Sequence, residues 1–577
     1  MDRALESLHG LGILAAALLS ACSADPSTVN ATSVGGSGTV QTGGSQSQGG
    51  TSSVGGTSNS GSTNTRATGG QSFSGGTQGL GGTATNSTGG ASASASGGNS
   101  TGGTKATTAG TASSGGSTPT GGSMATGGRS NSGGSGIATG GAAIGGQATG
   151  GTGTGGLATG GASRGPTPAT SSANFPFPQN RQATNCIYPT GYTNEDVQAV
   201  YAAWKAALVS SQGVGSPCTS CRRVIRPAEP GLQANSTVSE GIAYGMLIAV
   251  YMNDQSLFDD LWRYEQAHAW TFTATGQPSA ATSLMNWYIA SDGTVATQSN
   301  GGMSGAGAAT DADEDMAFAL IMADRQWKGG QGSLSKTYLA FAQQLLKDIW
   351  TYEIANYQLP KNGGGWGSDS CLNISYFAPA YYRVFASVSG ESRWLSSVVP
   401  YVYKVISQSL NSTNGNQDNG LVPAFSTSTG GTDQCGAQGQ STQAHNYQYD
   451  SCRTPFRIGQ DACFNDSTDA IGYVAKTSSF FAPKGAASIV DGYQLNGTPS
   501  AQYPGGTYNG LSAAFIGPAG VGAMRKQSGQ NYQSFVDGVY SLLRQNSQWC
   551  GGQYYDESWT MMTLLMMTGN FLDYTKY

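Results

Sequence analysis

The chain has 577 residues, of which 89 are glycine and only 10% are charged, and its net charge at neutral pH is −5. This balance provides no basic surface for nucleic acid and no polybasic segment for an anionic membrane face. We expect neither partner, and a neutral polymer fits better than a polyanion. The glycines are concentrated in the first third of the chain, so the part that can fold is shorter than the whole.

The first residues are typical of an export signal. An apolar run from Leu11 to Leu19 is too short to span a bilayer, and it leads into Leu19-Ser20-Ala21-Cys22, which resembles a bacterial lipobox. We expect residues 1–21 to be a lipoprotein signal peptide and Cys22 to be acylated. The alternative is an ordinary secretory signal with an incidental cysteine. The sequence therefore predicts an exported outer-membrane or cell-surface lipoprotein, or an extracellular protein, that contacts a membrane through its lipid alone.

The nine cysteines agree with export. If Cys22 carries lipid, eight thiols remain, and an exported domain would use them as disulfides. Cys218 and Cys221 could instead form a redox or zinc pair, but the chain has no second CxxC and only three histidines. We therefore expect no metal and no cofactor. The eight thiols that can pair are Cys186, Cys218, Cys221, Cys371, Cys435, Cys452, Cys463 and Cys550.

Residues 22–174 form a linker of Gly, Ser, Thr and Ala with Phe73 as the only aromatic residue before the composition changes. Such a segment cannot bury a core, so we expect a disordered tether. The alternative is a spacer with no role beyond solubility.

Residues 175–577 have the aromatic content and helical periodicity of one folded domain. Its first helix is predicted from a capping box at Thr193 and Asp196, followed by Val197, Val200, Tyr201, Trp204 and Leu208 on one face. Eleven or twelve such helices with little strand alternation predict an all-α domain of paired helical rings, with the chemistry in loops at one rim. The other predicted helices span about 239–252, 256–268, 313–327, 334–351, 375–388, 392–411, 466–478, 509–525, 530–546 and 556–568.

Glu240 precedes the apolar run Ile242–Tyr251, so we expect it in the first turn of a buried helix. Burial there raises a carboxyl pKa, although the helix N-terminus lowers it, and a general acid needs burial to dominate. The alternative is a carboxylate that only caps the helix.

The acids Asp311, Asp313 and Asp315 alternate as at the start of a calcium-binding loop. That interpretation fails because Met316 stands where the loop needs glycine and Met322 where it needs glutamate. We expect instead that Asp311 lies at the mouth of a helix, while its neighbours cap the helix or pair with Arg325.

Several ordered stretches resemble one enzyme family. Residues 309–320 (ATDADEDMAFAL) resemble the signature of glycoside hydrolase family 8, residues 238–246 (VSEGIAYGM) its general-acid segment, and residues 449–457 (YDSCRTPFR) its general-base segment. Residues 373–382 and 554–571 also fit. The resemblance extends over about residues 186–577.

The resemblance implies an (α/α)6 barrel and an inverting mechanism on cellulose, mixed-linkage glucan, xylan or chitosan. By position, Glu240 is the general acid, Asp450 the general base, and Asp311 the residue that holds the distorted sugar. We expect endo-acting hydrolysis of a β-1,4-linked glucan, with a xylanase or a licheninase as the alternative and chitosan a poorer fit.

Further residues near these motifs are candidates for binding the polysaccharide. Aromatic rings match the apolar faces of β-linked sugars, although core packing is the alternative for each. Arg453 is expected to orient Asp450 or to keep it ionised. Cys452, next to the base, suggests a disulfide that stiffens this loop. The aromatic candidates are Tyr244, Trp287, Trp366, Tyr376 and Tyr449.

A different class of function would be a monomeric surface protein that holds polysaccharide without cutting it. That interpretation would be natural if one of the three carboxylates were missing. Because Glu240, Asp311 and Asp450 are all present, we expect an enzyme. We also expect the protein to be a monomer.

Overall fold

The computed structural model describes residues 173–216, 218, 220–227, 233–273, 280–432, 445–501, 510–545 and 553–577. The expected signal peptide, the acylated Cys22 and nearly all of the linker lie outside these residues, as do Cys435 and Cys550. In the described part, no helix combines the length and the apolar character needed to cross a membrane.

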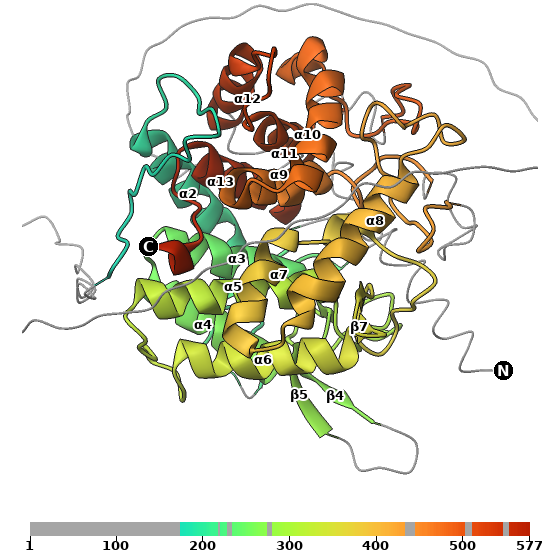
Figure 1. The fold of residues 1–577 in the computed structure, drawn as a ribbon. Coiled ribbons are helices and arrows are strands. Elements are labelled where there is room, and N and C mark those ends of the chain that lie inside the picture. The colour runs from blue at the N-terminus through green and yellow to red at the C-terminus, as the bar shows by residue number, and fades with distance from the viewer. Residues whose placement is uncertain are drawn as a thin grey trace, which may run out of the picture. The chain divides into compact units, whose positions relative to one another are not determined.

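The described residues are mostly helical (Figure 1). Short strands pair antiparallel in twos, as β1 with β2, β3 with β6, β4 with β5 and β7 with β8. The strands are β1 Val209–Ser210, β2 Arg223–Val224, β3 Thr237–Val238, β4 Ala269–Phe272, β5 Ala280–Met285, β6 Tyr288–Ile289, β7 Ile354–Ala355 and β8 Leu359–Pro360. The helices are α2 Asn194–Leu208, α3 Ser239–Tyr251, α4 Gln255–Ala267, α5 Thr310–Gln326, α6 Tyr338–Tyr352, α7 Pro379–Ser389, α8 Val399–Ser409, α9 Thr454–Asn465, α10 Thr468–Phe481, α11 Ala513–Ala523, α12 Gln533–Gln545 and α13 Tyr554–Met567.

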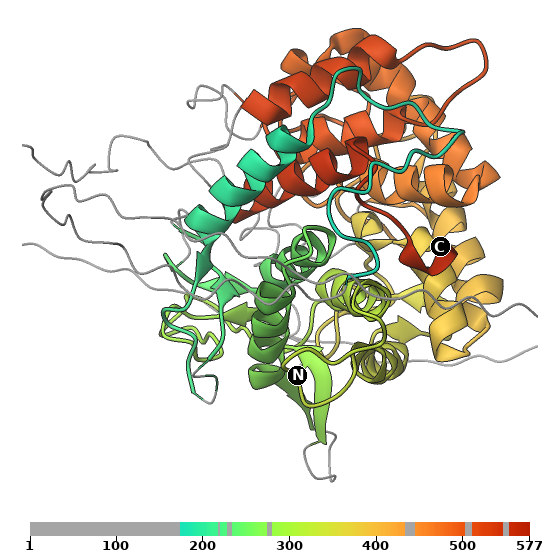
Figure 2. The same cartoon turned by 90° about the vertical axis from the view of Figure 1, so that its left-hand side faces the viewer.

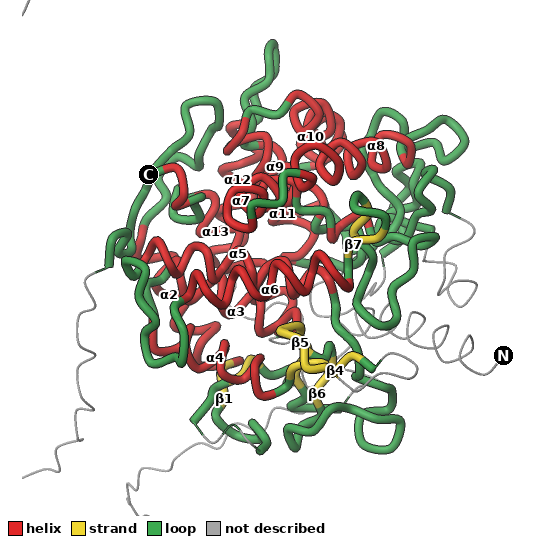
Figure 3. The backbone as a smooth tube through the Cα atoms, turned by 60° about the horizontal axis from the view of Figure 1, so that its bottom comes forward, coloured by secondary structure: helices red, strands yellow, loops and turns green. Residues whose placement is uncertain are grey.

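Alternate helices pack on one another in a closed sequence. Helix α3 packs on α5, α5 on α7, α7 on α9, α9 on α11, α11 on α13, and α13 returns to α3. Figure 3 shows these helices grouped near the centre, with α4, α8 and α10 farther out. Helix α2, from the start of the domain, lies along α12 and α13 from its end (Figure 2).

Burial explains why the helices of the ring differ in sequence from the others. Every residue of α3, α11 and α13 is buried, and the apolar runs of α3 and α11 are nearly continuous. Helix α4 instead buries one stripe that includes Leu257, Leu261 and Trp262, as expected for a helix with one face to solvent. At Gly517 of α11, a Cβ would lie 2.3 Å from the Thr563 hydroxyl of α13, so glycine permits this close approach.

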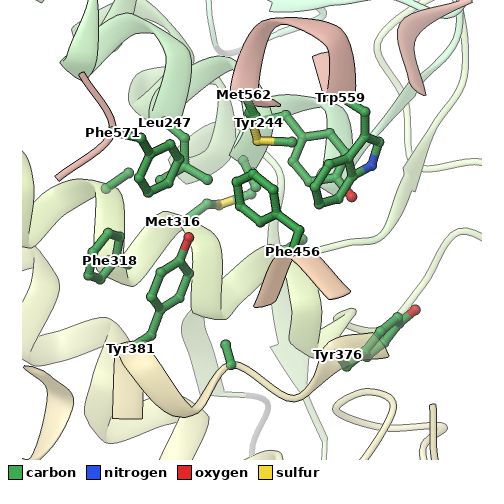
Figure 4. Close-up of a cluster of buried hydrophobic side chains, with 14 of the residues drawn as sticks. Tyr244, Leu247, Met316, Phe318, Tyr376, Tyr381, Phe456, Trp559, Met562 and Phe571 are labelled. Atoms are coloured by element: carbon green, nitrogen blue, oxygen red, sulfur yellow. The ribbon is translucent and has the colours of Figure 1, made fainter. Parts of the chain in front are cut away.

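The centre of the ring is an aromatic and sulfur-rich core (Figure 4). Phe318 of α5 and Tyr381 of α7 stack with ring centroids 3.8 Å apart. Phe456 of α9 meets Trp559 of α13 edge to face at 5.1 Å. Because these rings come from four helices, their packing fixes the helices relative to one another.

The predicted helices are found, with ends shifted by a few residues. Thr193 caps the first as expected, because its hydroxyl accepts from the Asp196 N–H at 3.1 Å. The Asp196 carboxylate accepts from Tyr540 instead of closing the capping box. Helix α9 was not predicted, because its buried face includes Arg457 and Asp461, which hide the apolar periodicity.

Disulfides join Cys186 to Cys463 and Cys218 to Cys221, and Cys371 is also disulfide-bonded. The expectation of a disulfide at Cys452 is wrong. Its thiol is free and buried, donates to the Tyr449 carbonyl at 3.3 Å and lies 3.7 Å from the Tyr555 hydroxyl. Hydrogen bonds therefore hold this loop where a disulfide was expected.

Candidate active site

The three predicted carboxylates come together where helices of the ring begin. Glu240 and Asp311 lie in the first turns of α3 and α5, and Asp450 lies in the loop just before α9. Their exposed fractions are 7%, 2% and 0%. Acids more than sixty residues apart in sequence thus share one buried environment, in which the protein sets their charge states.

Arg453 connects the three carboxylates. Its Nη1 contacts Glu240 Oε1 and lies 2.6 Å from Asp311 Oδ2, and its Nη2 lies 4.0 Å from Asp450 Oδ1. Its Nε donates to the Ser375 hydroxyl at 2.9 Å. One buried cation therefore faces three acids, so at least one acid is expected to keep a proton.

Glu240 is the acid that the surroundings keep protonated. Tyr244 donates to its Oε1 at 2.8 Å and Tyr554 to its Oε2 at 2.7 Å. Burial nevertheless dominates the lowering effect of Arg453 and raises the pKa of Glu240 to about 8. The group can therefore carry a proton at neutral pH, as a general acid requires.

Asp450 has a different set of partners. The Asn373 amide donates to its Oδ1 at 3.0 Å and the Gln448 amide to its Oδ2 at 3.2 Å. Burial raises the pKa of Asp450 to about 6. The rise is limited because Arg453 and these amides stabilise the ionised carboxylate and offset part of the desolvation. At neutral pH Asp450 is ionised while Glu240 is not.

The acids that follow Asp311 do not cap α5 or pair with Arg325, so that expectation is wrong. Asp313 accepts from the Met285 N–H at 3.2 Å, and Asp315 pairs with Arg457 of α9. Glu314 accepts from the Tyr382 hydroxyl at 3.0 Å. Because α5 is enclosed by other elements, its acidic side chains are buried and need hydrogen-bond or ion-pair partners. They find these partners on neighbouring elements, and so they join α5 to them.

The predicted aromatic residues differ in exposure. Trp366 is half-buried and lies against Gly307 and Gly363, where a Cβ would approach its indole to 2.5 Å. Trp287 is 4% exposed and donates to the Ser304 carbonyl at 3.1 Å. These two indoles come from loops that flank Asp311 in sequence.

The predicted tyrosines are buried. The Tyr376 ring lies under the Arg453 guanidinium, 4.9 Å from its centroid. Tyr449 donates to Asp491 at 3.2 Å, and Tyr244 donates to Glu240. Each of these three side chains is engaged by a neighbouring protein group, which favours a supporting role over direct stacking on sugar.

Sequence reasoning assigned no role to several residues that hold the acids, namely Asn373, Ser375, Gln448 and Tyr554. Asn373, Ser375 and Tyr554 lie in the motif segments 373–382 and 554–571, and Gln448 immediately precedes the segment 449–457. The motif segments were therefore the available signal. The contacts of Asn373, Ser375 and Tyr554 with Asp450, Arg453 and Glu240 are long-range in sequence, so no local pattern encodes them. Gln448 is only two residues from Asp450.

Comparison with known proteins identifies the class. The model of the family described as "Glycosyl hydrolases family 8" matches residues 175–569. Endoglucanase A of Acetivibrio thermocellus is 35% identical over 70% of this chain and 76% of its own length. Beta-glucanase of Niallia circulans is 29% identical over 70% of this chain and 93% of its own. The chain is therefore a glycoside hydrolase.

Solved structures agree. The apo structure of a beta-1,3-1,4-glucanase from Paenibacillus sp. X4 is 28% identical, with a TM-score of 0.58, over 69% of this chain and 99% of that one. The chain belongs to glycosyl hydrolase family 8, as the motif resemblance predicted. A more distant relative, the reducing end xylose-releasing exo-oligoxylanase of Bifidobacterium adolescentis, is 23% identical over 58% of this chain and 83% of its own length.

Proposed function

We propose that the protein is an inverting endo-glycosidase that hydrolyses a β-1,4-linked glucan, with Glu240 as general acid and Asp450 as general base. The observation that carries the proposal is the difference between two buried carboxyls, one with a pKa of about 8 and one with a pKa of about 6. When the surroundings of two carboxyls separate their pKa values in this way, the group with the higher pKa serves as the acid and the group with the lower pKa as the base. We further propose that the helical ring is an (α/α)6 barrel, which the closed packing order of alternate helices supports.

In this mechanism Glu240 donates its proton to the glycosidic oxygen as the bond breaks. The two phenols of Tyr244 and Tyr554 hold the carboxyl at both oxygens, so its orientation is fixed before the substrate arrives. Protonation makes the leaving sugar neutral, which lowers the barrier for cleavage.

Asp450 removes a proton from the water that attacks the anomeric carbon. The amides of Asn373 and Gln448 occupy one lone pair on each oxygen, and a carboxylate retains further sites for a water proton. In inverting enzymes the two carboxyls lie about 6.5–9.5 Å apart, which leaves room for that water. One attack from the opposite face inverts the anomeric configuration.

Asp311 is proposed to bind the sugar at the cleavage point through hydroxyl groups. Its Oδ2 is engaged by Arg453 and its Oδ1 by the Ala312 N–H. Developing positive charge on the sugar ring in the transition state would be stabilised by this carboxylate. Trp287 and Trp366 are the proposed stacking surfaces for neighbouring sugars.

The sugar preference is inferred from the relatives. Endoglucanases and β-glucanases are the most similar of the relatives named above, and the exo-oligoxylanase is more distant. A β-1,4-glucan or mixed-linkage β-glucan is therefore the first candidate, and xylan is the second.

Incubating the full chain in parallel with carboxymethylcellulose, barley β-glucan, xylan and chitosan, and measuring new reducing ends, ranks these substrates. Faster release from either glucan than from xylan and chitosan is expected. No release from any of the four would contradict enzymatic function and favour a protein that only holds polysaccharide.

We also propose that the enzyme is an exported lipoprotein, acylated at Cys22 and tethered by residues 22–174. The lipobox at residues 19–22 and the disulfides of the folded domain support this location. The tether would let an anchored enzyme reach a polymer that cannot diffuse to it.

A further inference from the structure

Three fully buried carboxylates lie near the site and take no part in the proposed reaction. They are Glu265 of α4, Asp313 of α5, and Glu353, the residue after α6, and each is 0% exposed. Glu265 Oε1 and Asp313 Oδ2 have no hydrogen-bond donor. The Thr310 hydroxyl and the Gly364 N–H face Glu353, but neither completes a hydrogen bond to its two carboxylate oxygens. Ionised carboxylates without donors are unstable in a protein interior, so this group must hold protons.

Asp313 and Glu353 face each other closely enough to hydrogen-bond when one of them is protonated. Two ionised carboxylates only accept, whereas a carboxyl can donate to a carboxylate. Burial raises the pKa of Glu353 to about 8 and that of Asp313 well above its usual range. Three other charged groups face this pair, namely Glu265 of α4, Glu314 of α5 and the half-buried Lys361 after β8. Two more lie next to these groups: Asp348 of α6 is near Glu265, and Asp369 is near Lys361.

The pair supports two segments that carry the proposed sugar-stacking residues. Asp313 accepts from the Met285 N–H, two residues before Trp287. Glu353 faces the Gly364 N–H and the Thr310 hydroxyl, and its carbonyl accepts from the Lys361 N–H at 2.8 Å.

These contacts continue to the catalytic groups. The Thr310 N–H, next to Asp311, donates to the Asn362 carbonyl at 3.2 Å. The Asn362 side chain accepts from the Asn373 N–H at 2.6 Å, and the Asn373 amide donates to Asp450. The loop of residues 361–367, which includes Trp366, therefore lies between the buried pair and the proposed base.

We propose that Asp313 and Glu353 are a positioning pair, bonded through a retained proton, that holds the loop of residues 361–367 and the segment Met285–Trp287 in the arrangement that binds the polysaccharide. The binding role rests on the proposed function. Loss of the last shared proton at alkaline pH leaves two negative charges facing each other, so the pair separates and the loop loses its support.

Binding of cellohexaose to the full chain, measured by calorimetry in a Glu240→Gln background, tests this pair. That background slows hydrolysis at least about a hundredfold and removes the titration of Glu240. Adding Glu353→Gln, which keeps a donor facing Asp313, should leave affinity at neutral pH within about twofold and abolish the weakening at alkaline pH. Adding Glu353→Ala should weaken binding about tenfold or more at neutral pH. Glu314→Gln is the control. Glu314 lies near the pair but its carboxylate is hydrogen-bonded by Tyr382 and not by the pair, so this variant should keep the neutral-pH affinity and the alkaline weakening of the parent.

A measurement without sugar separates this pair from the choice of substrate. The fluorescence of Trp366, taken as the difference from a Trp366→Phe variant, should change at alkaline pH in the parent and in Glu314→Gln, but not in Glu353→Gln. This result would support the pair even if cellohexaose failed to bind, an outcome that would count against the proposed glucan substrate instead.

An alkaline change that persists in Glu353→Gln, or neutral-pH affinity as weak in Glu353→Gln as in Glu353→Ala, would overturn the proposal. If Glu353→Ala does not fold, judged by circular dichroism, the Glu353→Gln arm decides alone.

Discussion

At the scale of single residues, the site is a set of buried acids distinguished by their partners. Glu240 is held by two phenols and Asp450 by two amides, and both face Arg453. Phenols and amides stabilise a carboxylate, but burial raises both pKa values and raises that of Glu240 further. The difference lets one carboxyl give a proton while the other accepts one.

The first prediction concerns pH. Activity requires ionised Asp450 and protonated Glu240, so kcat/KM should rise as pH increases through about 6 and fall as pH increases through about 8. A pH profile of kcat/KM on the preferred soluble polysaccharide checks both limbs. Replacing Glu240 with Gln should leave only weak activity without the alkaline limb that belongs to Glu240. An acid limb far below pH 6 would contradict the environment assigned to Asp450.

The second prediction separates chemistry from folding. Glu240→Gln and Asp311→Asn should each lower kcat at least about a hundredfold, the usual scale for losing general acid catalysis or a transition-state contact. Both substitutions preserve shape, so thermal melting should shift little. Steady-state kinetics on β-glucan with the melting curve of each variant provide the comparison. Near-normal kcat in Glu240→Gln would remove Glu240 from the role of acid.

At the scale of elements, helices of the ring deliver their first turns to one site. The N-terminal turns of α3, α5 and α13 supply Glu240, Asp311 and Tyr554, and the loop before α9 supplies Asp450 and Arg453. Residues separated by hundreds of positions meet because every second helix contributes to the same ring.

Most of these helices could be predicted from periodicity, and the three acids from motif resemblance. Helix α9 could not, because Arg457 and Asp461 are buried in ion pairs with other helices and disrupt the apolar pattern. The role of Arg453 between Glu240 and Asp311 also depends on long-range contacts. The free thiol of Cys452 shows the same limit, since counting cysteines does not reveal which of them lie within bonding distance.

The third prediction concerns the loop that supports Trp366. Gly307 has a φ of +99°, and a Cβ there would lie 2.5 Å from the Trp366 ring and 2.9 Å from the Gly364 carbonyl. Gly307→Ala should therefore displace Trp366 and raise KM for polysaccharide about tenfold, with a smaller change in kcat. Gly390→Ala is the matched control, because Gly390 has a φ of +73° with no atom near the added Cβ. Equal KM values in the two variants would argue against Trp366 as a sugar-stacking residue.

At the scale of the whole molecule, a folded hydrolase follows a long segment rich in Gly, Ser and Thr. Under the proposal that residues 22–174 tether the enzyme to a lipid anchor, the catalytic domain could search a nearby insoluble polymer. The arrangement suits an enzyme that acts at the cell surface on a substrate too large to import.

The fourth prediction tests the anchor. Cys22→Ala should abolish acylation and release the protein from membranes, because the lipid is the expected membrane contact. Labelling with a fatty acid, followed by fractionation of cells that express the parent or the variant, measures both effects. A variant that takes up as much label as the parent and stays with the membranes would refute acylation at Cys22.

The central claim is that Asp450 activates water for a single displacement, and the anomeric form of the first product tests it most directly. If water attacks once from the face opposite Glu240, a β-linked chain gives the α-anomer first, whereas a nucleophilic Asp450 would give two displacements and retention. Proton NMR recorded in the first moments of hydrolysis distinguishes the two. We expect the α-anomer first, with Asp450→Asn inactive but still able to bind oligosaccharide. The β-anomer appearing first, or a covalent sugar adduct on Asp450, would contradict it.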